Sequence, residues 1–448
     1  MRRCTKRVAI LKLLFALLVI AVPGISTTAQ TAEPLRLTLD DALHIAMNEN
    51  LSVKIADEEI ARVNWLKKEN WYMLLPSATG SVRYTNNILK PVFFSDLFPG
   101  GKAEIGSTHN YDIGGTVQVP LVSITLFKSI QLSEIDMKAA LESARGTKID
   151  MIMQVKNSFY GILMLEESLE VLSQSYKNAQ ETANNIKNMY DNGLASEYDM
   201  LRSDVAVRNI LPMITQSENG LELSKMQLKV LLSLDIDAPI ELIGDISAYR
   251  NLIENSILSN GFDLSDNSDV RALDIQMEKL NKSFEVMRSQ RLPSLAAFAD
   301  YQLRSQTPKF TFNTVWSNSF AAGLAIQIPI FNKLSISMKE KQIKVGINQL
   351  SYQRELLQRG LNLAATNSLN EMSRSKVQIA SDEQAVKQAE KGYEIAKVRY
   401  NTGAGTLLEL NDTEMALTNS RLNLNQTIYN YIKAKNEYEK VLGQEIIN

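Results

Sequence analysis

The sequence of 448 residues contains a single cysteine, Cys4, and only two histidines. Cys4 falls in the N-terminal leader described below, so the rest of the chain has no disulfide, no thiol nucleophile and no cysteine that could carry a lipid. His44 and His109 are too far apart in the sequence to form a metal-binding motif, and we expect no metal and no cofactor. Nucleotide-binding glycine loops, Walker motifs, H-E-x-x-H motifs and serine elbows are also missing. These absences argue against an enzyme.

Long hydrophobic runs are missing beyond the N-terminus, where no segment approaches the roughly 18 to 20 apolar residues that a membrane-spanning helix requires. Residues 1–29 combine basic residues, an apolar core over residues 13–22 and small residues before Ala29. This pattern predicts a secretory signal peptide cleaved after Ala29, because the apolar core is too short for a comfortable membrane anchor. The leader holds five basic and no acidic residues, so cleavage would change the formal charge from −2 to −7. A nucleic-acid-binding surface is therefore not expected.

Two similar motifs indicate an internal duplication. The first, at residues 190–199, reads Y-D-N-G-L-A-S-E-Y-D, and the second, at residues 400–412, reads Y-N-T-G-A-G-T-L-L-E-L-N-D. Residues 210 positions apart correspond: Tyr190 and Tyr400, Gly193 and Gly403, Asp199 and Glu409. A repeat of this length predicts one duplicated unit, with repeat one at 38–234, a mid-rod linker at 235–265 and repeat two at 266–443.

Helical periodicity dominates both repeats. The longest predicted helices cover residues 124–191 and 334–401, would each be roughly 100 Å long, and end in heptad seams typical of coiled coils. In repeat one, a helix from Thr38 to Leu74 and another over 196–232 have a summed length close to that of the long helix. We therefore expect the two shorter helices to stack end to end beside it, with Pro212 kinking or breaking the second one.

Strand-like alternation appears once in each repeat, in predicted β-hairpins at residues 77–120 and 294–330. Prolines mark the predicted junctions between helices and strands, at Pro76, Pro120, Pro293 and Pro329. Four strands are too few to close a barrel, so neighbouring copies must supply the rest. Two copies would give eight strands and a filled barrel, whereas three would give twelve strands and a passage.

The duplicated layout and the two glycine-containing motifs resemble the TolC family of outer-membrane efflux and secretion channels, over about residues 38–443. The resemblance implies a mixed but mainly α-helical fold, in which a long antiparallel coiled-coil helical barrel continues into a transmembrane β-barrel. It also implies a homotrimer in the outer membrane of a Gram-negative bacterium, in contact with lipid and extending into the periplasm. A periplasmic adaptor and an inner-membrane transporter would be its partners.

The same resemblance assigns roles near the second motif. Glu409 and Asp412 would ring the narrow periplasmic aperture, although acids in a first helical turn are favoured in any case. Tyr400 and Asp199 match a tip latch, a hydrogen bond between inner and outer helix pairs, with ordinary packing of Tyr400 as the alternative. Gly405 replaces the arginine that family members can carry, which leaves no salt bridge for this latch.

Gly193 and Gly403 are expected to adopt positive φ at the hairpin tips. The turns through Leu194 and Ala404 would, by resemblance, be where the adaptor docks. The resemblance thus implies a trimeric exit duct of a tripartite efflux or type I secretion system that passes small molecules. The alternative is a periplasmic coiled-coil adaptor or structural protein without a pore of its own.

Overall fold

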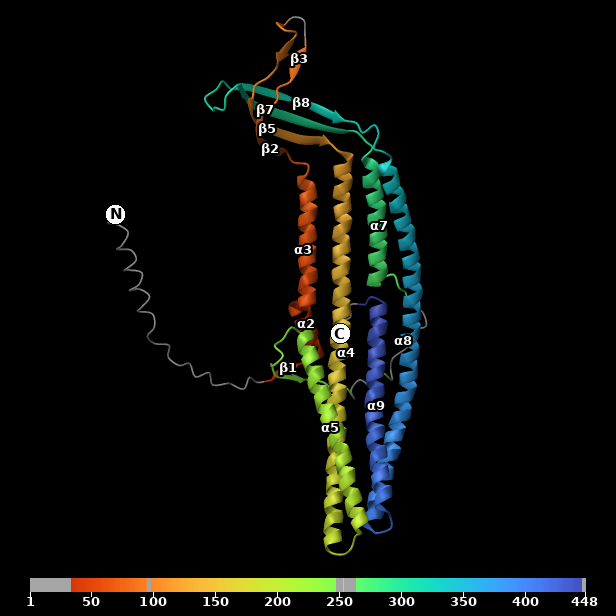
Figure 1. The fold of residues 1–448 in the computed structure, drawn as a ribbon. Coiled ribbons are helices and arrows are strands. Elements are labelled where there is room, and N and C mark those ends of the chain that lie inside the picture. The colour runs from red at the N-terminus through yellow and green to blue at the C-terminus, as the bar shows by residue number, and fades with distance from the viewer. Residues whose placement is uncertain (1–33, 95–97, 247–252, 254–262, 445–448) are drawn as a thin grey trace, which may run out of the picture.

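The computed structural model of the chain describes residues 34–94, 98–246, 253 and 263–444. The predicted signal peptide, its cleavage site and much of the linker lie outside these residues. The described part forms a long helical rod with a β-sheet at one end (Figure 1). None of its helices is long and apolar enough to span a membrane.

Two long helices and four shorter ones build the rod. The long helices are α4 (Ile124–Asp191) and α8 (Ser335–Asn401), close to their predicted bounds. The shorter helices are α3 (Leu51–Tyr72), α5 (Glu197–Leu231), α7 (Ser268–Ser289) and α9 (Leu407–Val441). Beside α4, α3 and α5 follow one another end to end, and α7 and α9 do the same between α4 and α8 (Figure 1). Pro212 lies inside α5 without ending it, so of the two predicted outcomes, a kink or a break, the break is absent.

The predicted helix from Thr38 to Leu74 is divided in two, which corrects the sequence prediction. It consists of α2 (Leu39–Glu49) and α3, and the break is at Asn50, whose ψ of 130° is not helical. The Asn50 side chain accepts a hydrogen bond from the Ser52 amide (2.7 Å) and donates one to the carbonyl of Leu231 (2.7 Å). One asparagine therefore caps the start of α3 and the end of α5 together.

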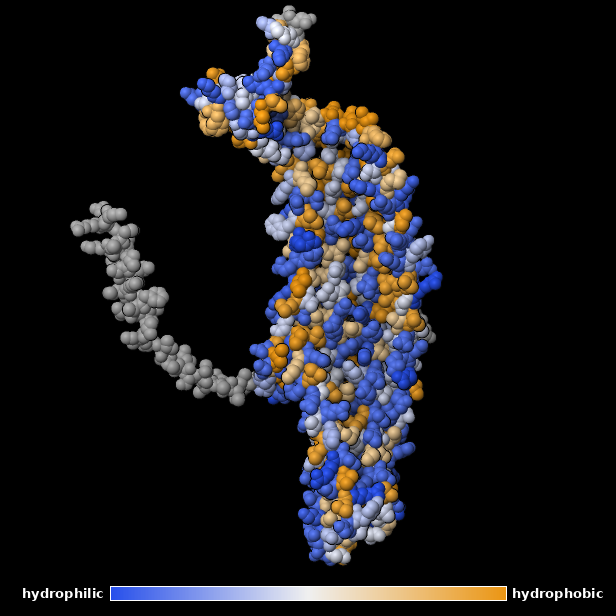
Figure 2. Space-filling view, in the orientation of Figure 1, coloured by the Kyte–Doolittle hydropathy of each residue, from blue (hydrophilic) through white to orange (hydrophobic). Residues whose placement is uncertain are grey.

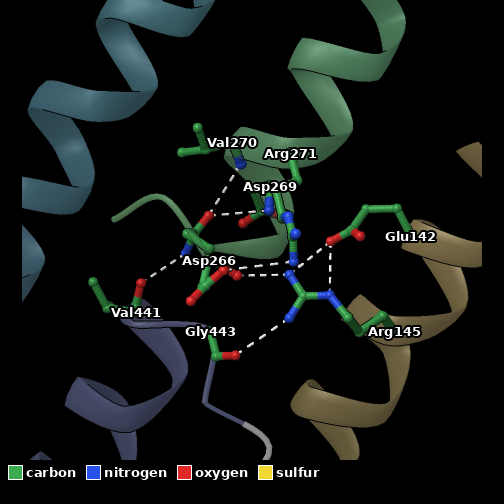
Figure 3. Close-up of polar contacts among 9 residues, drawn as sticks. Glu142, Arg145, Asp266, Asp269, Val270, Arg271, Val441 and Gly443 are labelled. Atoms are coloured by element: carbon green, nitrogen blue, oxygen red, sulfur yellow. Dashed lines mark hydrogen bonds and ion pairs between the residues drawn. The ribbon is translucent and has the colours of Figure 1, made fainter. Parts of the chain in front are cut away.

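Asn267 repeats this arrangement in the second half of the chain. Its φ and ψ are −61° and 128°, its Oδ1 accepts from the Val270 amide (3.1 Å), and its Nδ2 donates to the Val441 carbonyl (2.9 Å). Arg145 of α4 reaches the same junction and donates to the carbonyls of Asp266 (2.6 Å) and Gly443 (3.3 Å) (Figure 3). The end-to-end helices are thus joined to each other and to the long helix beside them.

The sheet has the order β2-β5-β7-β8 with antiparallel neighbours throughout. Its strands are β2 (Ser77–Asn86), β5 (His109–Val122), β7 (Ser294–Thr307) and β8 (Ser317–Gln327). Pro76 directly precedes β2, Pro293 directly precedes β7, and Pro329 follows β8. Pro120 was predicted to end its strand, but β5 continues through it to Val122. The pairing of β5 with β7 is irregular between Pro120 and Val122, and this bulge accommodates a residue that has no amide hydrogen. Within the described chain, β2 and β8 are edge strands.

Register gives the sheet two chemically different faces. Val82, Ile113 and Leu303 are aligned across β2, β5 and β7 on one face. Arg83, Asp112 and Arg304 are aligned in the next row, on the other face, where Arg304 forms an ion pair with Asp112 (2.6 Å). A sheet with one apolar and one charged face is suited to separating lipid from water.

Smaller strands complete the fold. β1 (Leu35–Leu37) pairs in parallel with β6 (Ile240–Leu242), and α2 packs beside them against α4. A hairpin of β3 (Val92–Phe94) and β4 (Lys102–Glu104) projects from the loop between β2 and β5 (Figure 1). The sequence did not predict these four strands.

The junction at Gly443 gives a prediction about stability. Gly443 has a φ of 71°, and a Cβ atom there would be 2.1 Å from the carbonyl oxygen of Asp266. We expect Gly443→Ala to lower the free energy of unfolding by roughly 2 to 4 kcal/mol, because positive φ and a backbone clash combine. The midpoint of thermal unfolding, followed by circular dichroism, measures the loss.

Gly193→Ala is the matched control. Gly193 has a φ of 76° but open space around the position of a Cβ atom, so only about 1 kcal/mol should be lost. Equal losses in the two variants would contradict a role for the Asp266 contact.

Candidate functional site

The two hairpin tips, between α4 and α5 and between α8 and α9, lie together at the end of the rod opposite the sheet (Figure 1). Gly193 and Gly403 have φ values of 76° and 78°, which confirms the predicted positive φ. The next amide in each turn closes the helix, from Leu194 to the Met189 carbonyl (2.7 Å) and from Ala404 to the Arg399 carbonyl (2.8 Å). Both glycines are surrounded by open space, so backbone conformation and not packing requires them.

The residues after these glycines are presented to solvent. Leu194 has 73% of its surface exposed, and Ala404 is also exposed. An exposed leucine on a closed, well-defined turn is available for contact with another protein. Docking of an adaptor at Leu194 and Ala404 remains a prediction.

Each tip leads into a capped helix. Ser196 caps α5, and its hydroxyl donates to the Asp199 carboxylate (2.6 Å). Thr406 caps α9 through a capping box in which Glu409 accepts from the Thr406 amide (3.4 Å). Asp199 and Glu409 thus occupy the same third position of corresponding helices, where an acid satisfies the free amides of the first turn.

Glu409 and Asp412 are three residues apart on α9 and are both exposed. This spacing places the two carboxylates on one face of the helix. Arg399 lies 3.7 Å from Glu409 across the tip, and both side chains are about half exposed. The two acids are therefore grouped at the end of the rod, and Glu409 also serves the helix cap.

Tyr400 and Asp199 lie close to each other. Burial raises the pKa of the Tyr400 phenol, and the negative charge of Asp199 raises it further by a smaller amount. The described side chains show no hydrogen bond between the two, and the Asp199 carboxylate accepts instead from Ser196. The tip latch remains a prediction.

Glu414 is a residue that the sequence analysis missed. Only 6% of it is exposed, and its Oε1 atom is buried without a hydrogen-bond partner among the described residues. Burial raises the pKa of the Glu414 carboxyl to about 7, although Asn178 and Lys397 favour the charged form. The signal was present, because residue 414 falls between the seam leucines Leu410 and Leu417 of the heptad pattern.

The tips carry no arrangement suited to a metal. Among the residues that the structure describes, no group of three or more histidine, cysteine, aspartate and glutamate side chains could hold one. The grouped acids, exposed turns and capped helices fit a surface for binding or passage.

Comparison with known proteins identifies similar chains. The family model described as outer membrane efflux protein matches residues 100–229 and 263–444. Toxin and drug export protein A of Aggregatibacter actinomycetemcomitans is 19% identical over 385 residues, covering 83% of this chain and 78% of the relative. Outer membrane protein TolC of Vibrio cholerae is 20% identical over 357 residues, covering 76% of this chain and 82% of the relative.

Solved structures share the fold. The outer membrane protein VceC of Vibrio cholerae superimposes with a TM-score of 0.71 at 15% sequence identity, covering 91% of this chain and 96% of that structure. The agreement therefore extends over both the sheet and the rod.

The Glu414 carboxyl predicts a pH-dependent stability. Below about pH 4.5 it is neutral in both the folded and the unfolded chain, and between about 4.5 and 7 it ionises mainly in the unfolded chain. Stability that is present at low pH is therefore lost as the pH rises through 7, by roughly 3 kcal/mol at most. Glu414→Gln should reduce the difference in the free energy of unfolding between pH 5 and pH 8, measured by urea unfolding.

Glu437→Gln provides the control, because Glu437 is an exposed acid on the same helix. This variant should keep the wild-type difference between the two pH values. An unchanged difference in Glu414→Gln would show that another group titrates.

Proposed function

This chain belongs to the outer membrane efflux protein family, and from this premise we propose that three copies of it form the exit duct of a tripartite efflux system. The family consists of outer-membrane channels and not of enzymes, and the chain is an outer-membrane protein that extends into the periplasm. The observation that carries the proposal is the four-stranded sheet with one apolar face, one charged face and two edge strands.

Closure of the sheet requires other copies. Unpaired amide and carbonyl groups at the edges of β2 and β8 would be costly in lipid, where no water can satisfy them. If β8 of one copy pairs with β2 of the next, three copies give twelve strands and every edge is paired. Twelve strands exceed the number at which side chains fill a barrel, so a water-filled passage results.

The apolar face of the sheet would contact lipid. Leu324 and Ile326 on β8 are each 67% exposed in the single chain, and Ile330 and Phe331 beyond the strand are exposed by 94% and 73%. Figure 2 shows apolar side chains gathered where the helical rod meets the sheet. A periplasmic adaptor or spacer without a membrane-inserted barrel would leave these side chains in water.

The rod would continue the passage into the periplasm. Helices from three copies would surround it, and Glu409 and Asp412 would place six carboxylates at the aperture formed by the hairpin tips. A periplasmic adaptor would dock at the turns through Leu194 and Ala404, and an inner-membrane transporter would supply the energy. Relatives named for the export of toxins and drugs and for solvent efflux favour small molecules as cargo, with type I secretion as a further role.

The proposal is tested on protein extracted from membranes in detergent. We expect a trimer whose migration on gels changes on heating, and stable conductance after insertion into planar lipid bilayers. A monomer that gives no conductance would overturn the proposal in favour of an adaptor.

The aperture gives a separate prediction. Glu409→Gln combined with Asp412→Asn removes six negative charges from the trimer, while glutamine can still take part in the helix cap. Block by multivalent cations added from the periplasmic side should weaken by on the order of tenfold, because the binding charge is lost. Single-channel recordings over a range of blocker concentrations measure the change.

Glu197→Gln is the control for this prediction, because Glu197 is an exposed acid in the first turn of α5. Its block should match that of the wild type. Equal block in the double variant would assign Glu409 and Asp412 to the outer surface.

A further inference from the structure

A line of buried polar side chains runs along α9. Glu414, Asn425 and Asn436 are each less than 9% exposed and are spaced 11 residues apart, which corresponds to three helical turns and places them on one side of the helix. Asn436 donates a hydrogen bond to Asn157 of α4 (2.7 Å), so this side of α9 faces α4. The line therefore lies at the joint between the α4–α5 hairpin and the α8–α9 hairpin.

Hydrogen bonding along this joint decreases toward the tips. At its upper end Asn436 is paired, and Lys156 of α4 forms a buried ion pair with Glu439 (3.2 Å). Nearer the tips, Asn425 Nδ2 and Glu414 Oε1 are buried without a hydrogen-bond partner among the described residues. Buried polar atoms without partners are rare in folded proteins, and a second arrangement that hydrates them is a physical reason to keep them.

The joint also contains an open space at the level of Asn425. A cavity of about 350 Å³ lies between α4 and α9. Its lining is Glu167, Glu170, Val171, Gln174, Arg421, Leu424, Asn425 and Ile428. This space gives water room to enter the joint if the two helices separate toward the tips.

The negative charge of an ionised Glu414 would be only partly compensated, because burial outweighs the groups around it. On α4, Asn178 hydrogen-bonds to Glu414, and on α8 Lys397 and Tyr393 lie near it. The charge of Glu181 on α4 also acts on Tyr393. The Lys397 ammonium group also lies over the ring of Tyr393, 5.8 Å from its centre. On α9 itself, the nearest cation along the same side, Arg421, is paired with Glu390 (2.6 Å).

We propose that Glu414 is a proton-controlled contact between the two hairpins: its neutral form holds the tip of α9 against α4, and its ionised form favours their separation. The inference rests on the proposed function, because in the proposed channel this separation opens the periplasmic end of the duct. The physical cause is that a buried carboxylate regains hydration only when the helices part. With a pKa of about 7 in the closed arrangement and an ordinary value in a hydrated one, the ratio of the two arrangements would change roughly 100-fold between pH 5 and pH 8.

Distance measurement between spin labels tests this proposal without requiring conduction. The described residues contain no cysteine, so Gln180→Cys on α4 and Asn419→Cys on α9, both at exposed positions, can be labelled selectively. Labelled chains are co-assembled with an excess of unlabelled chain, so that each assembly carries one labelled copy. Double electron–electron resonance then gives the separation of the two hairpins at pH 5 and pH 8.

In the otherwise wild-type background, a longer separation should gain population as the pH rises from 5 to 8. Glu414→Gln should keep the shorter separation at both pH values, and Glu437→Gln should behave like the wild type. Distances that do not respond to pH in the wild type, or that respond equally in Glu414→Gln, would overturn the proposal.

Bilayer recordings of the same variants separate this proposal from the proposed function. If Glu414 acts on the aperture, the open probability of the wild type should rise with pH and that of Glu414→Gln should not. Absence of conductance in all variants at every pH would count against the channel, while the distances would still decide the role of Glu414.

Discussion

Backbone hydrogen bonding at the two edges of the sheet is the constraint on which the rest of this protein depends. In lipid, an unpaired strand edge has no water to satisfy its amides and carbonyls. The order β2-β5-β7-β8 leaves one such edge on each side of the chain. Each edge strand is followed or preceded by a helix of the rod: α3 comes before β2, and α8 comes after β8. Pairing of edges between copies would therefore also set those helices side by side, and a closed barrel would extend into a closed helical tube.

Beside the unbroken helices α4 and α8, the rod is completed by pairs of shorter helices joined end to end. An unbroken helix beside α4 is replaced by two shorter helices whose facing ends would each leave backbone groups unpaired. Asn50 and Asn267 each pair with both facing helix ends. The side-chain NH2 group donates to a carbonyl at the end of one helix, and the side-chain oxygen accepts from an amide at the start of the other. The glycine at 443 and the guanidinium of Arg145 complete the second splice. The same solution used twice shows that duplication copied the joints together with the helices.

Features that depend on local sequence could be predicted, and features that depend on distant partners could not. Heptad spacing and glycine tips gave the bounds of α4 and α8 and the positive φ of Gly193 and Gly403. The break at Asn50 was missed because its stabilising partner, Leu231, is 181 residues away. Pro120 was assigned to the end of a strand, since the bulge that accommodates it involves β7. At the tips, the grouping of Glu409 with Asp412 followed from spacing, but the partner of Asp199 and the burial of Glu414 required packing between helices.

The pairing of the two tips has a consequence for stoichiometry. Each chain presents two turns with nearly the same backbone but different side chains, with Leu194 after the glycine in one turn and Ala404 in the other. In the proposed trimer, a partner that recognises only the shared backbone meets six quasi-equivalent positions. A partner that distinguishes leucine from alanine meets three. The ratio of partner to channel would therefore depend on whether the partner binds the backbone that the two turns share or the side chains in which they differ.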